Sequence, residues 1–451
     1  MNYRHDDTIA ALATAPGKGA VAIIRLSGPQ SLPIAERLTG ISPSPREAHV
    51  CSFRDEDGDA IDRGLLLFFP GPRSFTGEDV IELHGHGGAV VSDMLFACTL
   101  RFGARAAEPG EFSLRAFLND KLDLLQAEGI ADLVDSGSAK AARAAYRSLD
   151  GRFSDQVRAV QKQLTALRVQ LEAWLDFPDE ELELNDTSDF EKDFDLAIAA
   201  LEVLLTQARE GAVLSNGITV VIAGPPNAGK SSLLNRLSGY DAAIVTSAPG
   251  TTRDALRERL SLDGLPLLVV DTAGLRESED PIELEGMRRA YRAAESADRL
   301  IWVTDVRIEL AAQLERIHDM AGEGVAVTVV QNKVDLVDED AKRYEQDGIS
   351  VIRMSALTGV GLELLTDHLK SIAGYHADAS GTFSARTRHI EAMKRAEHYI
   401  RDARLQLVNT LALELAAEEL RSAQRALDEV TGEVTSDDLL GEIFSSFCIG
   451  K

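Results

Sequence analysis

The segment GPPNAGKS, Gly224 to Ser231, has residue types and spacing that could hold a chain of phosphates. It fits the pattern G-x-x-x-x-G-K-[ST] and lies between an apolar strand-like run, ITVVIAG, and a helix-like run, SLLNRL. Its glycines let backbone N–H groups curl around phosphates, and the following helix N-terminus adds positive partial charge. We expect Lys230 to reach the β- and γ-phosphates and the Ser231 hydroxyl to bind Mg²⁺. This motif leaves open which base the nucleotide carries.

Three later motifs select guanine. DTAG, Asp271 to Gly274, follows the apolar run PLLVV and suits a carboxylate near Mg²⁺ and an N–H group facing the γ-phosphate. In NKVD, the carboxylate of Asp335 can accept hydrogen bonds from N1–H and the 2-amino group of guanine, and adenine has neither donor. Lys333 can cover the base, and MSA, ending at Ala356, can offer a backbone N–H to the guanine oxygen. The four motifs in this order predict a guanine-nucleotide domain.

The surroundings of these motifs indicate how hydrolysis differs from that of Ras-like proteins. Leu275 follows DTAG, where Ras-like GTPases have the glutamine that orients the attacking water. Arg253 and Arg276 lie in the expected switch regions, but spacing assigns neither as an arginine finger. The amide of Asn227 and the oxygen-rich segment Thr246 to Asp254 could form a cage for a monovalent cation that replaces the charge of an arginine.

Composition limits the class of protein. The chain has 451 residues, enough for about three domains, with 45% hydrophobic and 27% charged residues, as in soluble globular proteins. We find no secretory signal and no apolar run of membrane-spanning length, so no membrane association is expected. Cys51, Cys98 and Cys448 are scattered, which favours a reducing compartment, and we expect the cytoplasm. A net charge of −26 disfavours unspecific binding to nucleic acid, so any such partner needs a local basic patch or a second protein.

The hydrophobic pattern predicts a multidomain chain: an α+β N-terminal domain, an all-α helical domain, and an inserted α/β P-loop domain of Ras-like type. Residues 1–120 carry short strand-like runs between Gly and Pro turns. Residues 121–215 have helical periodicity and form the first part of the helical domain. Residues 216–375 alternate strands and helices, which predicts a doubly wound parallel sheet. Residues 376–451 are helical again and end in the tail CIGK.

Three smaller features have more than one interpretation. His84 and His86 face the same side of a strand, but spacing places no further metal ligand, so we expect structural or pocket-lining roles. The basic segment RTRHIEAMKRAEHYIRDAR could contact RNA phosphates, although a solvated helix face accounts for it as well. Cys448 is fourth from the end, but Gly450 and Lys451 break a prenylation box.

Taken together, the motifs resemble those of the bacterial tRNA-modification GTPase family called MnmE or TrmE. The resemblance covers the whole chain in three blocks. The first contains FTGEDVIELHGHGG and PGEFSLRAFLNDKLDLLQAE, the second GPPNAGKSSLLN, PGTTRD, DTAGLRE and NKVD, and the third GEIFSSFCIGK. Ribosome-associated GTPases share the middle block but lack the first and the last.

For the N-terminal domain, the resemblance implies a fold similar to folate-binding aminomethyltransferase domains. It implies dimerisation, hence a homodimer, and a bound tetrahydrofolate derivative of the 5-formyl or 5,10-methylene type. Carried over by motif, the folate contacts are Arg25, Glu82, Lys121 and Lys451.

For the P-loop domain, the resemblance implies K⁺ bound by Asn227, Thr246, Ala248 and Thr251, and Mg²⁺ bound by Ser231 and Thr252. Glu283 corresponds to the general base that acts on the attacking water, and Lys230 assists catalysis. Pro249 departs from the small residue that the family more often has before GTTRD. The expected nucleotide contacts, which lie in the four motifs and the switch segment, are Asn227, Ala228, Gly229, Lys230, Ser231, Ser232, Thr246, Ser247, Ala248, Pro249, Gly250, Thr251, Thr252, Asp271, Thr272, Ala273, Gly274, Asn332, Lys333, Asp335, Ser355, Ala356 and Leu357.

The resemblance also implies a reaction and partners. The family works with a flavoprotein, MnmG, which brings FAD and NADH, in a heterotetrameric or larger complex. Together they place an aminomethyl or carboxymethylaminomethyl group on C5 of the wobble uridine of certain tRNAs. Two alternatives are a ribosome-assembly GTPase, disfavoured because no RNA-binding domain follows the P-loop domain, and a switch that uses GTP only to reorganise its partner.

The resemblance gives the C-terminal tail a context. We expect it to fold back toward the folate pocket, with Phe447 as an anchor, Gly450 permitting close approach, and Lys451 offering positive charge to the cofactor. Cys448 is a candidate catalytic thiol or a structural residue, and its environment decides whether a thiolate forms.

Overall fold

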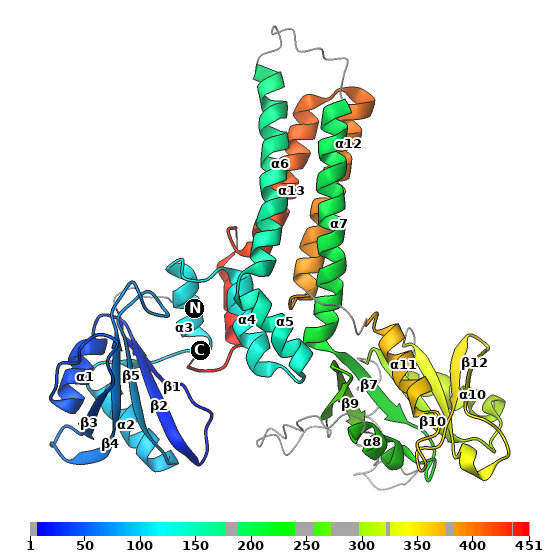
Figure 1. Ribbon diagram of the computed structural model, residues 1–451, viewed down its shortest axis with the longest axis horizontal. Helices are drawn as coiled ribbons and strands as arrows, with labels where there is room; N and C mark the ends of the chain where they lie inside the picture. The colour runs from blue at the N-terminus through cyan, green and yellow to red at the C-terminus, as the bar shows by residue number, and fades with distance from the viewer. Residues whose placement is uncertain are drawn as a thin grey trace. The chain divides into compact units, whose positions relative to one another are not determined.

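The computed structural model describes residues 7–176, 188–239, 257–271, 297–321, 325–375, 382–434 and 436–450 (Figure 1). It divides into two compact units: residues 1–131, 149–194 and 398–451 form the first, and residues 132–148 and 195–397 form the second. In the part of the chain that is described, no helix is long and apolar enough to cross a membrane.

The first unit contains a six-stranded sheet in the order β3-β4-β5-β2-β1-β6. Its pairs are antiparallel except for the parallel contact of β1 with β6. The strands are β1 (Ile9–Leu12), β2 (Gly19–Ser27), β3 (His49–Arg54), β4 (Ala60–Phe69), β5 (Val80–Gly87) and β6 (Arg105–Ala106), and the helices of this region are α1 (Ser31–Thr39), α2 (Ala89–Arg101) and α3 (Glu111–Leu118).

The two faces of this sheet differ because side chains alternate along each strand. Ile24 and Leu26 of β2 belong to a buried apolar cluster that also takes in Leu38 of α1 and Leu95 of α2. Arg25, between them, faces the opposite side. That side carries a second, smaller buried cluster as well as polar side chains such as Arg25. The cluster is Ile9, Ala11, Ala107 and Phe112.

Helices make up most of the remaining chain outside the second sheet. Long runs without Pro, with few Gly and with apolar residues at helical spacing, account for them. They are α4 (Leu124–Asp135), α5 (Ala139–Leu149), α6 (Arg152–Asp176), α7 (Ser188–Asn216), α12 (Thr387–Thr410), α13 (Leu413–Thr431) and α14 (Asp437–Ser445). In the first unit α6 packs along α13 (Figure 1).

The C-terminal helix α14 joins the tail to the N-terminal region. Phe444 and Phe447 are buried with Leu114 of α3 and Leu124 of α4 in one cluster. The rings of Phe444 and Phe447 lie 5.2 Å apart, and that of Phe117 lies 6.3 Å from Phe444. The prediction that Phe447 anchors the tail is therefore confirmed.

The second unit contains a seven-stranded sheet in the order β12-β13-β11-β10-β7-β9-β8. The strands are β7 (Ile218–Ala223), β8 (Arg257–Leu262), β9 (Leu265–Asp271), β10 (Arg299–Asp305), β11 (Val327–Asn332), β12 (Lys342–Gln346) and β13 (Ile349–Arg353). The helices are α8 (Lys230–Ser238), η1 (Leu310–Gln313), α10 (Leu314–Ala321), η2 (Val334–Leu336) and α11 (Leu362–Ile372). The five central strands are parallel, as predicted, but the edge strands β8 and β12 pair antiparallel with β9 and β13. The predicted parallel sheet is therefore confirmed at its centre, and the antiparallel edge strands depart from the prediction.

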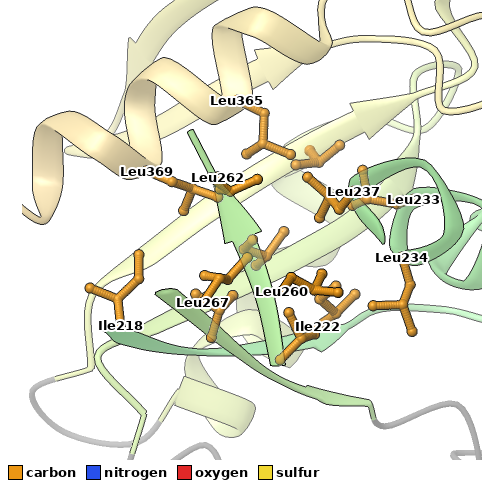
Figure 2. Close-up of a cluster of buried hydrophobic side chains, with 14 of the residues drawn as sticks. Ile218, Ile222, Leu233, Leu234, Leu237, Leu260, Leu262, Leu267, Leu365 and Leu369 are labelled. Carbon is orange, nitrogen blue, oxygen red and sulfur yellow. The ribbon is translucent and has the colours of Figure 1, made fainter. Parts of the chain in front are cut away.

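A buried cluster fixes α8 against this sheet (Figure 2). Leu233, Leu234 and Leu237 of α8 point into it. The sheet and α11 contribute Ile218, Ile222, Leu260, Leu262, Leu267, Leu365 and Leu369. Burial of one such side chain stabilises the fold by roughly 1.5–3 kcal/mol. The helix N-terminus that should face the phosphates is therefore held on a rigid core.

Candidate functional site

The P-loop lies between β7 and α8, with Lys230 as the first residue of the helix. Gly229 has φ +99°, and a Cβ there would lie 2.2 Å from Asn332 Nδ2. Only glycine therefore fits this close approach. Lys230 Nζ donates to the carbonyl oxygens of Gly224 (2.9 Å) and Pro225 (3.0 Å), so the lysine lies over the loop. The loop offers the cradle that a phosphate chain needs.

Asn332 connects three parts of this region. Its Nδ2 donates to the Ala228 carbonyl at 2.8 Å, and its Oδ1 accepts from the N–H groups of Lys333 and Ala356, each at 2.8 Å. The asparagine thus fixes the P-loop to the segment expected to bind the base. The Ala356 N–H that the sequence offers to guanine is hydrogen-bonded to Asn332 in this structure.

The carboxylate of Asp335 and the side chain of Lys333 are both positioned by neighbours. Ser355 Oγ donates to Asp335 Oδ1. Lys333 has a left-handed backbone, φ +70°, and its Nζ lies 3.0 Å from Asp305 Oδ2. Arg307 binds the same carboxylate through Nε (2.9 Å) and Nη2 (2.7 Å). These hydrogen bonds from Arg307, and then Lys333, hold the pKa of Asp305 well below its usual range although burial opposes the shift.

A hollow of about 630 Å³ lies between α8 and the segment after β13. Ser232 and Arg236 of α8 line one side, and Ala356 and Leu357 line the other. Arg236 donates to the carbonyl oxygens of both Ala356 and Leu357, which fixes that segment. The Leu357 side chain is exposed, so an apolar surface is available beside the hollow.

Several predicted residues of this site lie outside the described part of the chain. They are Thr246, Ser247, Ala248, Pro249, Gly250, Thr251, Thr252, Thr272, Ala273, Gly274 and Glu283. Asp271 is the last residue of β9. Two predicted residues of the P-loop segment are described. Asn227 has φ +59°, and Ser231 lies in the first turn of α8.

The second group of predicted residues meets on the open face of the N-terminal sheet. Arg25 of β2 and Glu82 of β5 are directly opposite in the sheet register. Arg25 Nε and Nη2 lie 3.0 Å and 2.9 Å from Glu82 Oε1. The Arg25 guanidinium also lies 5.8 Å from the Phe75 ring and 5.9 Å from the Phe112 ring. This half-buried ion pair lies beside two aromatic rings, of which Phe112 is buried and Phe75 is exposed. Phe75 could stack on a flat polar ring.

The C-terminal tail reaches this ion pair. Arg25 Nη1 donates to the Gly450 carbonyl at 3.4 Å, and the Gly110 N–H donates to the Cys448 carbonyl at 3.4 Å. Gly450 has φ +95°, and a Cβ there would lie 2.7 Å from the Leu12 carbonyl oxygen. The prediction that Gly450 permits close approach is confirmed. Cys448 is exposed, and Lys451 lies outside the described residues.

Lys121 is linked to the same face through a loop. Its Nζ donates to the Pro72 carbonyl at 3.0 Å, and Asn119 Nδ2 donates to the Thr76 carbonyl at 2.7 Å. Phe75, which lies near Arg25, belongs to this loop. Lys121 therefore holds the loop that borders the Arg25–Glu82 pair.

Sequence reasoning missed three partners of these residues. His84 Nε2 lies 3.0 Å from Glu82 Oε2, so the second carboxylate oxygen is also occupied. Asp305 was missed although it ends the strand next to the one that NKVD follows. Arg115, whose side chain is fully buried, bonds to Glu78, Asp7 and Glu111. For His84, the signal in the sequence was its spacing of two residues from Glu82, which places both side chains on one face of the strand.

The remaining candidates are structural in the described part of the chain. His86 Nδ1 lies 2.7 Å from Asp62, and no group of three His, Cys, Asp or Glu side chains among the described residues could hold a metal ion. Cys51 and Cys98 are buried, and burial raises the pKa of both thiols.

Comparison with known proteins covers nearly the whole chain. A family model described as the MnmE helical domain matches residues 124–448, and one described as the N-terminus of GTP-binding protein TrmE matches residues 8–121. The tRNA modification GTPase MnmE of Stutzerimonas stutzeri is 52% identical over 450 residues, with 99% of each chain covered. The proteins of the same name from Sodalis glossinidius and Hydrogenovibrio crunogenus are 51% and 48% identical, covering 99% and 100% of both chains.

One solved structure with similarity to part of this chain is the G domain of the T. maritima FeoB iron transporter. It is 25% identical, covers 35% of this chain and 98% of that chain, and has a TM-score of 0.27.

Proposed function

This chain belongs to the MnmE family of tRNA modification GTPases, and on that premise we propose that it is a K⁺-stimulated GTPase that modifies wobble uridines together with a flavoprotein partner, MnmG. The product is an aminomethyl or carboxymethylaminomethyl group on C5 of the uridine in certain tRNAs. A tetrahydrofolate derivative of the 5-formyl or 5,10-methylene type is the one-carbon donor. The main structural support for the proposal is the Arg25–Glu82 ion pair, because Arg25 also donates a hydrogen bond to Gly450 of the C-terminal tail.

The enzyme hydrolyses GTP with Mg²⁺, as its family does. In the proposed site, Lys230 exchanges the loop carbonyls of Gly224 and Pro225 for phosphate oxygens. Asp335 accepts from the guanine edge, and Lys333 covers the ring. Ser231 and Thr252 would hold Mg²⁺, which neutralises charge between the β- and γ-phosphates when bound.

For hydrolysis, we assign the general base to Glu283 and a K⁺ site to Asn227, Thr246, Ala248 and Thr251. The support is chemical. Leu275 stands where a water-orienting glutamine would be, so another side chain must act on the water. Spacing assigns no arginine finger, so another positive charge is needed. Turnover should be faster in KCl than in NaCl, and equal rates would remove the K⁺ assignment. Glu283→Ala should impair turnover and leave GTP binding largely intact.

At the folate site, Arg25, Glu82, Lys121 and Lys451 would bind and orient the cofactor. Arg25 and His84 hold the Glu82 carboxylate in a fixed direction, and its oxygens can accept hydrogen bonds from the N–H groups of a pterin ring. The exposed ring of Phe75, 5.8 Å from the Arg25 guanidinium, offers a stacking surface. Cys448 is exposed beside the tail contact and is a candidate catalytic thiol.

The proposal includes an assembly. A homodimer formed through the folate-binding domain, residues 1–120, works with MnmG in a heterotetrameric or larger complex, in the cytoplasm. FAD stays on the partner. The helical domain, residues 121–215 and 376–451, carries the inserted G domain, residues 216–375.

The deciding experiment is mass spectrometry of wobble uridines in cells that lack this protein. We expect unmodified C5 positions, restored by the intact gene. Wobble uridines that stay fully modified would overturn the proposal.

A further inference from the structure

We propose that Arg236 of α8 is a positioning residue for guanine recognition, because it fixes the backbone of residues 355–357, called here the base segment. The inference rests on the proposed nucleotide site, in which the Ala356 N–H of this segment donates to atom O6 of guanine. Arg236 lies outside the four nucleotide motifs. It connects the helix that begins at the P-loop with the segment that faces the base.

The guanidinium of Arg236 donates to two successive carbonyl groups of the base segment. Nε donates to the Ala356 oxygen at 3.2 Å, and Nη2 donates to the Leu357 oxygen. No other group among the described residues donates to either oxygen. Because arginine carries its donors in a rigid planar fork, a contact with two acceptors fixes both peptide groups relative to α8.

The peptide group that contains the Ala356 N–H is held from its other side. Its carbonyl oxygen, on Ser355, accepts from the Gly359 N–H at 2.8 Å. Gly359 has φ +89°, and a Cβ there would lie 3.7 Å from Arg236 Cζ, so this turn lies against the guanidinium. Since a peptide group is planar, its N–H can turn only with the whole plane. Contacts on three successive peptide groups therefore set the direction of the Ala356 N–H.

Side-chain packing holds only part of the base segment. Ala356 is buried in the cluster beneath α8, whereas the Leu357 side chain is 74% exposed. Leu233 and Leu237 of α8 point into the same cluster, so the backbone of Arg236 is fixed (Figure 2). Arg236 is the only charged side chain among the described residues that line the hollow of about 630 Å³. No carboxylate of that lining competes with the two carbonyl oxygens for its donors.

The direction of this N–H matters because it has a second acceptor nearby. The Ala356 N–H donates to Asn332 Oδ1 at 2.8 Å, so guanine O6 must share or replace that acceptor. In the proposed site, Asp335 binds a different part of the base, N1–H and the 2-amino group. Loss of Arg236 should therefore weaken recognition of O6 and leave recognition of the 2-amino group intact.

The test uses the full-length chain and two analogues of GDP. 6-Thio-GDP differs from GDP only at atom 6, where sulfur is a weak acceptor, and IDP lacks only the 2-amino group. We expect Arg236→Met, which removes the donors and keeps an unbranched side chain, to weaken GDP binding about two- to tenfold, the effect of one lost hydrogen bond. The preference for GDP over 6-thio-GDP should fall by a similar factor, and the preference for GDP over IDP should stay the same. Arg236→Lys, which keeps the charge without the fork, should show a smaller loss.

The matched control is Asn235→Ala, since Asn235 lies on the same helix and lines the same hollow but makes no hydrogen bond to the base segment among the described residues. It should bind all three nucleotides like the unaltered chain. Equal losses of both preferences in Arg236→Met would indicate general loosening and overturn the inference, as would unchanged preferences or the same loss in the control. An unaltered chain that binds ADP as well as GDP would instead overturn the guanine site itself.

Discussion

At the scale of single residues, Asp305 has a clear consequence for nucleotide binding. Its carboxylate lies 3.0 Å from Lys333 Nζ and holds the lysine that is expected to cover the guanine. We predict that Asp305→Asn weakens GTP and GDP binding by about 1–2 kcal/mol, or roughly five- to thirtyfold, because the charge-assisted contact is lost. Turnover at saturating GTP should change little. Nucleotide titration and steady-state kinetics measure both.

A double-mutant cycle separates positioning from a general structural effect. If Asp305 acts through Lys333, then Asp305→Asn should cost almost nothing more in a Lys333→Ala background. Additive losses in the cycle would contradict the prediction. Arg307→Ala is the control, since it removes the other partner of the same carboxylate and leaves the contact with Lys333.

Residues inside motifs could be predicted from the sequence, and their partners could not. The pattern of the P-loop and NKVD located Lys230, Asn332 and Lys333, because each motif fixes a backbone conformation as well as a side chain. Asp305 lies in no motif, and Arg115 lies in the first block of the resemblance without a role assigned to it. The contacts of both depend on which strands and helices become neighbours in space. Partners of this kind become visible only with the fold.

At the scale of elements, the packing of α11 on the sheet makes the second unit sensitive to acid. His368 of α11 is buried, and its Nε2 lies 2.9 Å from Thr328 Oγ1, which also accepts from Arg299. The two groups share a hydrogen bond whose direction depends on the tautomer of the imidazole. Burial, followed by the charges of Arg343 and Arg299, lowers the pKa of His368 to about 4.

The sign of the effect follows from the ordinary pKa of about 6.5 in the unfolded chain. Between pH 6.5 and pH 4 the unfolded state binds the proton and the folded state does not, so the free energy of unfolding falls as the pH falls. The loss reaches about 3 kcal/mol at most. His368→Gln, which cannot titrate, should remove this component in denaturant titrations across that pH range. An unchanged slope in the variant would refute the assignment to His368.

The C-terminal tail is a second element whose anchoring can be tested. Phe447 is buried against Phe444, and the tail beyond it reaches Arg25. We predict that Phe447→Ala releases the tail and weakens folate binding about tenfold or more, while GTP turnover stays the same. The lost burial costs roughly 3–5 kcal/mol of local packing. Calorimetric titration with 5-formyltetrahydrofolate measures the affinity.

Ile449→Ala provides the control for the tail, because Ile449 is exposed and its truncation removes no buried contact. It should bind folate like the unaltered chain. Equal losses in both variants would mean that the tail acts through its exposed residues and not through its anchor.

The edges of the second sheet show that a readable signal can still be missed. An Asp-Gly turn joins each antiparallel edge strand to its neighbour. Asp263 and Gly264 have φ +51° and +98°, and Asp347 and Gly348 have φ +53° and +76°. Two consecutive residues with positive φ are typical of a tight hairpin turn, and Asp-Gly is a strong short-range signal for it. Strand alternation suggested a parallel sheet, but these two dipeptides indicated the hairpins at its edges.

At the scale of the whole molecule, one chain carries two sites whose chemistries differ. The P-loop site lies in the second compact unit, and the Arg25–Glu82 site lies in the first. If both serve one modification, then a variant that disables either site should abolish the product and leave the other site intact. A chain that only reorganises its partner would need the GTP site alone.

Arg25→Ala and Glu283→Ala test this requirement in cells that lack the native protein. We expect Arg25→Ala to lose folate affinity about 10- to 100-fold, because it removes a charged hydrogen-bonding group, and to keep normal GTP turnover. Glu283→Ala should show the reverse pattern. Both should leave wobble uridines unmodified by mass spectrometry. Normal modification with Arg25→Ala, together with lost folate binding, would favour the switch, since the transfer chemistry would then not pass through this chain's folate site.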